Sequence, residues 1–508
     1  LQARPMTALP EPADWTPPGP GLWARNFRLG EWLPDPMTPL FATWLLPAIE
    51  DGYLAGMRAT VGAVVPFRYA AVNGWYYNAT PIPSIGLLAR ALRDSRGRIV
   101  PVLVNALVRV GRNPVAADRA MLSTLHRRWR DGHLPDYRRM VSTAEAEVDH
   151  ADPPRLRRLV DELGHAAGQY LWFLAIVGGS AWKIEGCLTR FCRQHLATVD
   201  AVRDGAQVLL RGLPGAEPVT PPHAVHSVDW YHPTAGEHPD PAEPADQGSR
   251  RHRQLAADRQ AAEIACRQAL ATARRTATRF DALLEVAQRY AVIREEQARD
   301  LTLAWPVLRR CAHRLGEDLH ARGQIPDPAD VFFLTRAELD HHTTSYTCLI
   351  DERHAQWHRQ ARLSPPLTLG TPARLIGDPI AHAVHQARGG RPIPDGAIVG
   401  HPASTGRATG RIRLIDTPDQ FDQFTAGEIL LARATAPAWT PLFARAAAVI
   451  TDGGTLAAHA SLVAREYGIP AVVGTGDATR RLRTGQMVTV DGTTGIVTPA
   501  TASGTRAR

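Results

Sequence analysis

The chain has 508 residues, 44% of them hydrophobic, so it is too long for one core and we expect two to four domains. No stretch approaches the roughly 18 apolar residues of a membrane span, so we expect no membrane partner. The net charge is +8, but the basic residues are scattered and Lys183 is the only lysine, so we expect no nucleic-acid partner. The first residues lack a signal-peptide pattern and the 5 cysteines lack CxxC spacing, which predicts a cytoplasmic protein without a disulfide framework or metal site.

The N-terminal half has the pattern of a helical region that follows a linker. Residues 9–22 are rich in proline and form the expected linker. From Trp23 to about Leu210, apolar residues recur at spacings of three and four, which is typical of helices. Two short stretches, Ala70–Tyr77 and Ile99–Leu103, have strand or turn character instead.

Two further segments follow before the composition changes. Residues 212–248 are rich in proline and polar side chains, which predicts a long mobile loop. From about Arg250 to Gly323 the chain is rich in Ala, Arg, Gln, Glu and Leu, which predicts two or three long helices with solvated faces.

A Gly/Pro cluster at Arg388–Asp395 predicts a domain boundary. After it, short β-branched runs alternate with glycines, and one helical segment is expected at about Ala457–Tyr467. The strands are expected at Ile412–Ile415, Ile429–Leu431, Ala448–Thr451, Ala471–Val473 and Met487–Val490. This pattern predicts a compact α/β domain at residues 396–500, followed by a disordered tail at 501–508.

The histidine that follows a Gly-Gly turn is the strongest candidate for a chemical role. Gly453 and Gly454 follow an expected strand, and His459 falls in the first turn of the expected helix. Unpaired backbone N–H groups and the positive end of the helix dipole suit that position to a phosphate. A neutral imidazole nitrogen is available as a nucleophile at neutral pH. Asp452, Arg465 and Glu466 are close enough in sequence to orient the ring or to balance its charge, and a histidine that only caps the helix is the alternative.

Ordered motifs throughout this domain resemble the mobile phosphohistidine domain of the PEP-utilising enzyme family, which includes the rifampicin phosphotransferases and PEP synthases. The matching residues are Gly400-x-Pro402-Ala403-Ser404-x-Gly406, Gly410, Thr435-x-Pro437-x-Trp439-Thr440-Pro441, Asp452-Gly453-Gly454, His459, Ala464-Arg465-Glu466, Gly468-Ile469-Pro470-Ala471-Val472-Val473-Gly474 and Asp491-Gly492-x-x-Gly495. The resemblance implies that His459 carries the phosphoryl group. It also implies a multi-domain protein, with a mainly α-helical substrate domain followed by a small α/β (β/β/α) swivelling phosphohistidine domain.

One position departs from the family pattern. Ala457 and Ala458 stand where the family usually has Thr-Ser before the histidine. A hydroxyl that could hold the phosphoryl group or the imidazole is therefore missing. We expect this to change the rate of phosphoryl transfer, whereas His459 remains the expected carrier.

The N-terminal residues 1–8 resemble the closing strand of the family's ATP-grasp nucleotide domain, whose body is not in this sequence. ATP and Mg²⁺ are therefore expected to bind to an ATP-grasp domain, in cis or on a separate chain, and not to this chain. Residues 23–390 resemble the substrate domain of the same family, through Glu31-x-x-Pro34-x-Pro36-x-Thr38-Pro39-Leu40, Gly74–Asn78, Arg294-Glu295 and Asp330–Leu334.

Candidate residues for binding a small-molecule acceptor lie at four places in this region. They are the aromatic run Trp75, Tyr76, Tyr77 and Asn78, the pair Trp182 and Lys183, the pair Arg294 and Glu295, and Arg299. An acceptor pocket is mostly apolar with a few polar groups, which these residues would supply. Core packing of the aromatics and an exposed row of salt bridges on the helix of Arg294 are the alternatives.

The resemblance implies a dikinase-type phosphotransferase that moves a phosphoryl group from ATP, through His459, to an oxygen of a small hydroxylated and largely apolar molecule, such as an antibiotic or a phenol. AMP and phosphate are the expected by-products. A first alternative is a condensing enzyme, similar to the prodigiosin-type synthases, that activates a carbonyl oxygen so that two heterocycles can be joined. A second is a non-catalytic binding protein with a degenerate swivel domain.

Overall fold

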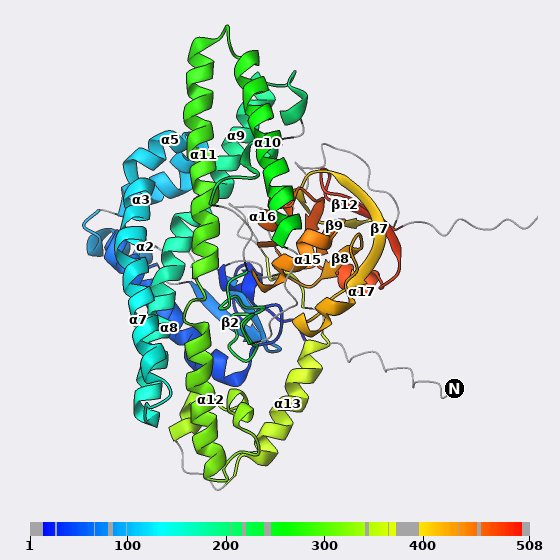
Figure 1. Cartoon of the computed structure of the whole chain (residues 1–508). Coiled ribbons are helices and arrows are strands. Elements are labelled where there is room, and N and C mark those ends of the chain that lie inside the picture. The colour runs from blue at the N-terminus through cyan, green and yellow to red at the C-terminus, as the bar shows by residue number, and fades with distance from the viewer. Residues whose placement is uncertain are drawn as a thin grey trace, which may run out of the picture.

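The computed structural model describes residues 14–499 except for 26–27, 66, 80–84, 98, 204, 216–219, 238–244, 341–344, 364, 372–395, 436 and 455–458. Residues 14–371 form a mostly helical part, and residues 396–499 form a mixed α/β domain beside it (Figure 1). The expected remnant at 1–8, the boundary at 388–395 and the tail at 501–508 lie outside the described residues, and the domain limits stay predictions.

The helical part contains long helices joined by short ones. The α-helices are α1 (Leu46–Val61), α2 (Ile85–Asp94), α3 (Ile99–Leu103), α4 (Val110–Arg112), α5 (Pro114–Ala117), α6 (Ser123–Arg127), α7 (Leu134–Glu147), α8 (Pro153–Ile176), α9 (Ala181–His195), α10 (Ala245–Ala269), α11 (Arg274–Asp300), α12 (Trp305–Ala321) and α13 (Thr347–Ala361). Wider π-helical turns occur at Phe41–Leu45, Val104–Arg109, Asp118–Leu122 and Arg128–His133. Two or three long helices were expected from about Arg250 to Gly323, and α10, α11 and α12 confirm that prediction.

Helix α8 lies at the centre of the main core, where it packs along α1. The two backbones approach closely because glycines face the partner helix: a Cβ on Gly52 would lie 1.9 Å from the carbonyl oxygen of His165, and one on Gly168 would lie 2.0 Å from that of Ile49. The continuous helical stretch Pro153–His195 is long and apolar enough to cross a membrane, but 56% of its most apolar window is buried. A core helix meets the same criterion, and the packing of α8 fits that interpretation.

A small antiparallel sheet lies beside the helices. Its strands are β1 (Trp23–Ala24), β2 (Arg68–Val72), β3 (Trp75–Ala79) and β4 (Thr368–Leu369), in the order β2-β3-β1-β4. Strands β2 and β3 form a hairpin, with Val72 opposite Trp75, which agrees with the strand or turn character expected at Ala70–Tyr77. Through β4 the sheet joins the end of the helical part to its beginning, which holds the chain near Trp75 in place.

The segment Ile99–Leu103 is helical, so the strand or turn prediction there was wrong. Its β-branched residues favoured a strand, but a helix satisfies its backbone groups without a neighbouring strand. Ile99 is buried whereas Val100 is exposed, so the segment contributes one anchor to the core and leaves its other face in solvent.

The expected mobile loop at 212–248 also differs from the structure. Val225, Val228 and Trp230 are fully buried in the main core, and Trp305 donates its indole N–H to the carbonyl of Val228 at 2.9 Å. Arg309 donates to the carbonyls of Trp230 and His232 as well. Proline content and polarity predicted a loop correctly, but the few apolar residues among them anchor residues 223–237 inside the protein.

The C-terminal domain is built on one eight-stranded sheet. Its strands are β5 (Ile398–Val399), β6 (His401–Ser404), β7 (Arg407–Leu414), β8 (Ile429–Ala432), β9 (Ala448–Thr451), β10 (Ala471–Val473), β11 (Met487–Asp491) and β12 (Ile496–Pro499), in the order β5-β12-β11-β7-β8-β9-β10-β6. The pairs β7–β8, β8–β9 and β9–β10 are parallel and the others are antiparallel. All five expected strands are present.

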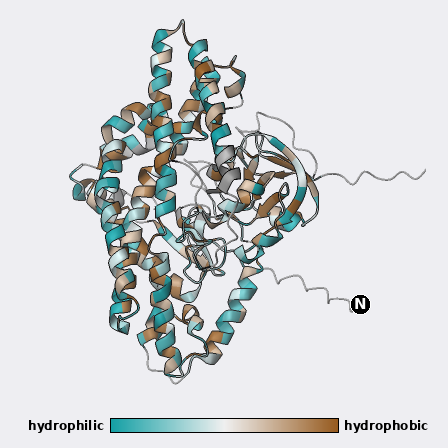
Figure 2. Cartoon of the chain, in the orientation of Figure 1, coloured by the Kyte–Doolittle hydropathy of each residue, from teal (hydrophilic) through white to brown (hydrophobic). Residues whose placement is uncertain are grey.

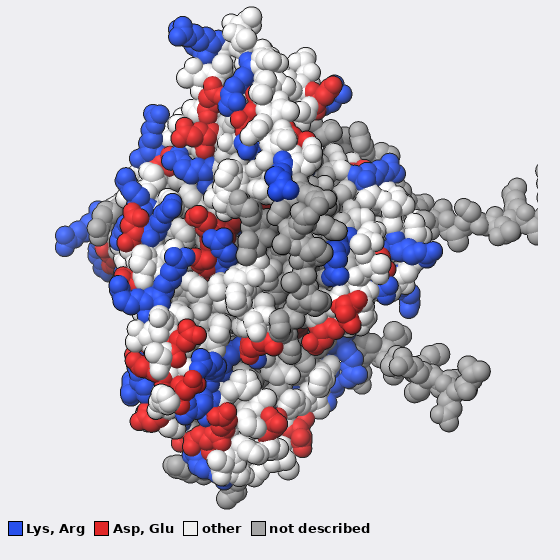
Figure 3. Space-filling view, viewed as in Figure 1, with Lys and Arg blue, Asp and Glu red and all other residues white. Residues whose placement is uncertain are grey.

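Helices α15 (Thr440–Arg445), α16 (His459–Glu466) and α17 (Ala478–Arg481) cover the sheet, and buried apolar residues fill both of its faces. Figure 2 shows these strands as largely hydrophobic, whereas the outer faces of the long helices are hydrophilic. Basic and acidic side chains are interspersed over the helical surface in Figure 3, in agreement with the scattered charge of the sequence.

Substitution of Thr38 tests whether its hydrogen bonds to Asp229 stabilise the segment at 223–237. Its backbone N–H and hydroxyl donate to the carboxylate of Asp229 at 2.6 and 2.9 Å. We expect Thr38→Val to lower the free energy of unfolding by about 1.5–3 kcal/mol in urea titrations, because a buried carboxylate loses a donor. Thr60→Val, which removes a bond within helix α1, should cost less than about 0.5 kcal/mol.

The same variant should respond to pH. Burial raises the pKa of Asp229 to about 6, against the opposing effect of its hydrogen bonds from Thr38 and Tyr231. The carboxyl is therefore protonated well below pH 6 and charged well above it, and its favourable contribution to stability is lost as the pH rises through about 6. The loss in Thr38→Val should be larger above that pH, and an equal loss on both sides would contradict the assignment.

Candidate functional site

Three parallel strands of the C-terminal domain end at the same edge of its sheet. Arg433 follows β8, Asp452 to Gly454 follow β9, and Gly474 to Gly476 follow β10. In open α/β sheets, ligands bind at the carboxyl ends of parallel strands because the loops there converge. This edge faces the helical part and carries the Gly-Gly turn that the sequence singled out.

Backbone hydrogen bonds hold the Gly-Gly turn between the neighbouring loops. The N–H of Gly453 donates to the carbonyl of Arg433 at 2.7 Å, and the N–H of Gly474 donates to the carbonyl of Gly453 at 3.1 Å. Gly454 has a φ of 104°, a backbone conformation that residues other than glycine rarely adopt. The turn is therefore a fixed feature of the edge.

Asp452 anchors these loops to helix α17. Its carboxylate accepts hydrogen bonds from the hydroxyl of Thr475 at 3.0 Å, from the backbone N–H of Thr479 at 3.1 Å and from the hydroxyl of Thr479. Burial raises the pKa of Asp452, although these hydrogen bonds act in the opposite direction. These three bonds give Asp452 a structural role, and its expected part in orienting the histidine stays a prediction.

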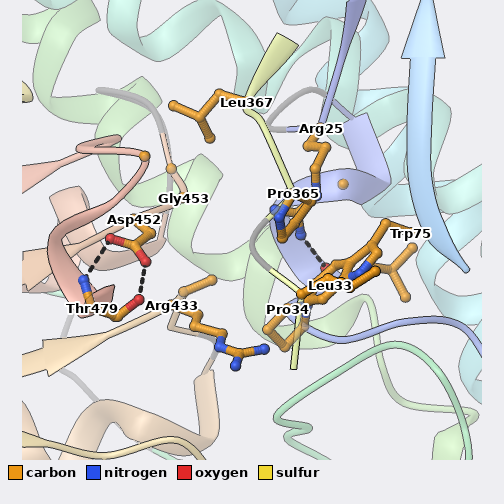
Figure 4. A pocket seen from close by; sticks show the side chains of 15 residues that line it. Arg25, Leu33, Pro34, Trp75, Pro365, Leu367, Arg433, Asp452, Gly453 and Thr479 are labelled. Carbon is orange, nitrogen blue, oxygen red and sulfur yellow. Dashed lines mark hydrogen bonds between the residues drawn. The ribbon is translucent and has the colours of Figure 1, made fainter. Parts of the chain in front are cut away.

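A cavity lies between this edge and the helical part (Figure 4). Its two basic side chains come from opposite sides: Arg25 from the helical part and Arg433 from the C-terminal domain. Both guanidinium groups lie over the ring of Trp75, at 4.4 and 5.9 Å from its centre. The remaining lining residues are Gly30, Leu33, Pro34, Leu363, Pro365, Leu367, Ala434, Asp452, Gly453, Gly454, Gly476 and Thr479.

Arg25 keeps its charge in this enclosed space. Burial lowers the pKa of Arg25 to about 10, and the charge of Arg433 acts in the same direction, against Tyr77, Asp35 and Asp452. Arg25 thus stays protonated at neutral pH. Two like charges that converge on one cavity favour the binding of an anion, because the anion offsets their repulsion.

Helix α16 begins at His459 among the described residues, so His459 lies in its first turn, as predicted from a helix at about Ala457–Tyr467. Residues 455–458, which include Ala457 and Ala458, and the side chain of His459 lie outside the described part of the structure. The backbone nevertheless places His459 at the start of the helix that leads from β9 to β10. The Gly-Gly turn that lines the cavity is therefore on the chain segment that leads into the candidate carrier.

The aromatic run on β3 divides between the cavity and the core. Trp75 lines the cavity. Tyr76 is buried in the main core, Tyr77 donates its hydroxyl to the carbonyl of Pro366 at 2.7 Å, and Asn78 is buried. Contact of Trp75 with an acceptor stays a prediction, whereas its neighbours are buried in the structure, as the alternative interpretation had it.

A second cavity brings together residues that the sequence analysis placed in separate groups. Trp182 on α9 and Arg294 and Glu295 on α11 line it together with Arg465 and Glu466 at the end of α16. Burial raises the pKa of Glu295, against the charges of Arg294, Arg299 and Arg465. Its Oε1 atom is buried without a hydrogen-bond partner in the described part of the structure, which suits it to bind a polar group.

Arg465 joins the two parts of the protein. Its guanidinium donates to the carboxylate of Glu185 on α9 at 2.7 Å and to the carbonyl of Ala403 on β6 at 2.6 Å. The other two basic candidates do not line either cavity: the ammonium of Lys183 lies 5.5 Å from the ring of Trp182, and Arg299 pairs with Asp300 at 3.3 Å. Arg299 therefore has the salt-bridge role that was its alternative.

The buried segment at 223–237 supplies a further contact between the two parts. Trp439 of the C-terminal domain donates its indole N–H to Nδ1 of His226 at 2.8 Å, and Nε2 of His226 lies 3.2 Å from the carboxylate of Asp35. Burial alone would raise the pKa of Asp35, but the hydrogen bond from His226 and the charge of Arg433 are among the effects that lower it to about 2.

Sequence reasoning missed four of these residues: Arg25, Arg433, Asp35 and His226. Arg433 lies just before the motif around Thr435, and Asp35 lies inside the motif that begins at Glu31, so the sequence contained a signal near these two residues. Arg25 and His226 had none, because only the fold brings positions 25 and 226 to this interface.

Comparison with known proteins agrees with this architecture. Residues 424–495 match the family described as PEP-utilising enzyme, mobile domain. A phosphotransferase of Bacillus subtilis, YvkC, whose function is uncharacterised, is 37% identical over 37% of this chain and 23% of its own length. Rifampicin phosphotransferase of Streptomyces sviceus is 34% identical over 45% of this chain and 26% of its own, and chondramide synthase of Chondromyces crocatus is 35% identical over 43% and 6%.

The match over residues 424–495 identifies a mobile domain of the PEP-utilising-enzyme type within the C-terminal domain. The chain is homologous over part of its length to phosphotransferases of that family, including rifampicin phosphotransferase. It spans about a quarter or less of the length of these relatives.

The anchoring role of Asp452 can be tested by its removal. We expect Asp452→Ala to lower the free energy of unfolding of the C-terminal domain by about 2–3 kcal/mol, because Thr475 and Thr479 lose their acceptor. Asp477→Ala is the matched control, since Asp477 is partly exposed and lies 3.8 Å from Arg481; it should cost less than about 0.5 kcal/mol. Equal, small losses in both variants would contradict the anchoring role.

Proposed function

We propose that this chain is the substrate-binding and phosphohistidine-carrying part of a dikinase-type phosphotransferase. It receives a phosphoryl group from ATP on His459 and passes it to an oxygen of a small molecule, with AMP and phosphate as by-products. The observation that carries this proposal is the cavity between the two parts, in which Arg25 and Arg433 converge beside the Gly-Gly turn that precedes His459.

The chemistry of the cavity suits a phosphoryl group and an apolar acceptor. The two guanidinium groups offset the charge on the phosphoryl oxygens, and the ring of Trp75 offers an apolar face to the acceptor. The acceptor hydroxyl oxygen attacks phosphorus, the P–N bond to His459 breaks, and the hydroxyl proton ends on the imidazole nitrogen that is released. The acceptor gains the phosphoryl group and His459 returns to its neutral form.

Charging of His459 requires ATP and Mg²⁺, and the residues described here do not fit that pair. The one compact set of metal-ligating side chains found among them is Asp35, His226 and His232, whereas Mg²⁺ prefers oxygen ligands. We therefore assign the binding of ATP and Mg²⁺ to an ATP-grasp domain, in cis or on a separate chain. We also propose that the protein is cytoplasmic. Neither nucleic acid nor membrane takes part in the proposed reaction.

The acceptor class follows from the apolar lining and from the relatives. A hydroxylated, largely apolar molecule such as an antibiotic or a phenol fits a cavity with Trp75, Leu33 and Leu367 on its walls. The similarity to rifampicin phosphotransferase over 45% of this chain supports an antibiotic as substrate, and hence a role in resistance.

Condensation of two heterocyclic precursors is the alternative, because an aromatic wall suits flat rings as well. The similarity to chondramide synthase over 43% of this chain supports a role in natural-product biosynthesis. Product analysis separates the two reactions: a stable phosphorylated acceptor indicates a kinase, and a joined product with free phosphate indicates a ligase.

Substitution of His459 tests the carrier and the non-catalytic alternative together. In the protein joined to its nucleotide domain, we expect His459→Ala to abolish acceptor-dependent formation of AMP, because no group remains to take the phosphoryl. His150→Ala, at an exposed position of the helical part, should leave the rate unchanged. Wild-type protein that never forms phosphohistidine would favour the non-catalytic binding protein.

Substitution of Arg25 tests the cavity as the place of transfer. We expect Arg25→Ala to slow discharge of phospho-His459 to the acceptor by roughly a hundredfold, because one of two charges facing the phosphoryl group is lost. The charging of His459 should change less than about twofold, since Arg25 lies in the other part of the protein. Arg68→Ala, whose guanidinium lies 4.8 Å from the ring of Trp23 outside the cavity, is the control. Normal discharge in Arg25→Ala would move the transfer elsewhere.

A further inference from the structure

Contacts of several kinds connect the C-terminal domain with the helical part. Arg465 pairs with Glu185, Arg433 donates to the carbonyl of Ala361 at 2.8 Å, and the backbone N–H of Thr405 donates to Gln207 at 3.0 Å. Each of these involves a partly buried group. The bond from Trp439 to His226 differs, because Trp439 is 0% and His226 is 2% exposed.

The hydrogen bonds of His226 define its tautomer. An indole N–H can only donate, so Nδ1 of His226 must be the acceptor and carry no proton. The proton of the neutral ring is then on Nε2, from which it is donated to the carboxylate of Asp35 at 3.2 Å. Trp439, His226 and Asp35 thus form one directional chain of hydrogen bonds, which we call the docking chain.

The docking chain lies next to the candidate site. Asp35 interacts electrostatically with both Arg25 and Arg433, the two basic residues of the first cavity. Trp439 precedes α15 and packs edge-on against Phe421 inside the C-terminal domain, with ring centres 5.2 Å apart. The indole is therefore fixed by packing within its own domain, and its N–H group makes the hydrogen bond across the interface to His226.

We propose that the docking chain positions the C-terminal domain for delivery of the phosphoryl group, with Trp439 and His226 as positioning residues. The proposal rests on the proposed function, in which this domain must also leave the interface to be charged. Undocking exposes an indole N–H and an imidazole nitrogen to water, which can bind both, so the chain holds the domain without making its release prohibitive.

A metal ion is the rival explanation of the three side chains Asp35, His226 and His232, whose ligand atoms all lie within 4.8 Å of one another. To bind a metal through Nε2, a neutral His226 would need its proton on Nδ1, where it would face the indole N–H of Trp439 at 2.8 Å. Two N–H groups, one on the indole and one on Nδ1, cannot form a hydrogen bond with each other. In the docked arrangement Nε2 of His226 is therefore occupied by its hydrogen bond to Asp35 and is not free to bind a metal.

Two substitutions of His226 separate the links of the chain. Asparagine carries an oxygen at the position of Nδ1 and can still accept from Trp439, but it does not reach Asp35. Glutamine carries an amide nitrogen at the position of Nε2 and can still donate to Asp35, but its acceptor is displaced from Trp439. Both variants keep a polar amide in the same buried place, so general damage to the segment would affect both.

The position of the domain can be measured on this chain by electron paramagnetic resonance between two spin labels. Cys348, exposed on α13, takes one label, and Met487→Cys, at an exposed position of β11, takes the other. The other four cysteines are buried. We expect one narrow distance distribution for wild type and for His226→Asn. For His226→Gln we expect a second population, with the ratio of undocked to docked protein raised roughly tenfold.

A single narrow distribution in His226→Gln, or equal broadening in both variants, would overturn the proposal. Tight binding of Zn²⁺ by the wild-type chain with the docked distance retained would overturn it too, because it would require the other tautomer.

A kinetic measurement separates this proposal from the proposed function. In the protein joined to its nucleotide domain, His226→Gln should slow discharge of phospho-His459 roughly tenfold and leave charging unchanged, whereas His226→Asn should do neither. If wild type is never charged, the proposed function fails while the distance measurement still decides the docking. If charging occurs and discharge is the same in both variants, docking through His226 is not what positions the domain.

Discussion

The structure depends on one constraint, the common edge at which β8, β9 and β10 end. Because parallel strands end together, Arg433, Asp452 and the Gly-Gly turn converge although they lie in separate loops. Everything proposed about the site depends on which surface meets that edge. In this protein it is the surface formed by Arg25 and Trp75, positioned by the small sheet that joins the beginning and end of the helical part.

The interface combines strong local order with contacts that a moving domain can break. Within each part, the positions are fixed by buried apolar side chains and by polar groups such as Asp452, whose bonds are internal. Among the described residues, the polar contacts between the parts are hydrogen bonds and the ion pair of Arg465 with Glu185. Partly buried pairs of this kind contribute modestly, because water competes for both partners. Such an interface suits a domain that must dock in one place and leave it again.

Much of the C-terminal domain could be predicted from sequence, because its strands are short β-branched runs bounded by glycines and its motifs are ordered as in the family. The start of α16 at His459 followed from the same local pattern. The helical part was harder. Ile99–Leu103 was misjudged because β-branched residues favour strands only where a neighbouring strand is available, and residues 223–237 were misjudged because burial depends on Trp230 and Val228 rather than on average polarity. Arg25 and His226 could not be found locally, since their roles arise from contacts over hundreds of residues.

The central claim is that His459 carries a phosphoryl group on a domain that delivers it across this interface. The most direct measurement is peptide mapping by mass spectrometry under conditions that preserve phosphohistidine, after the protein joined to its nucleotide domain has been given ATP and Mg²⁺. The account predicts one acid-labile phosphoryl group, on the peptide that contains His459, that disappears when a competent acceptor is added. Phosphorylation at another residue, or a label on His459 that no acceptor discharges, would contradict it.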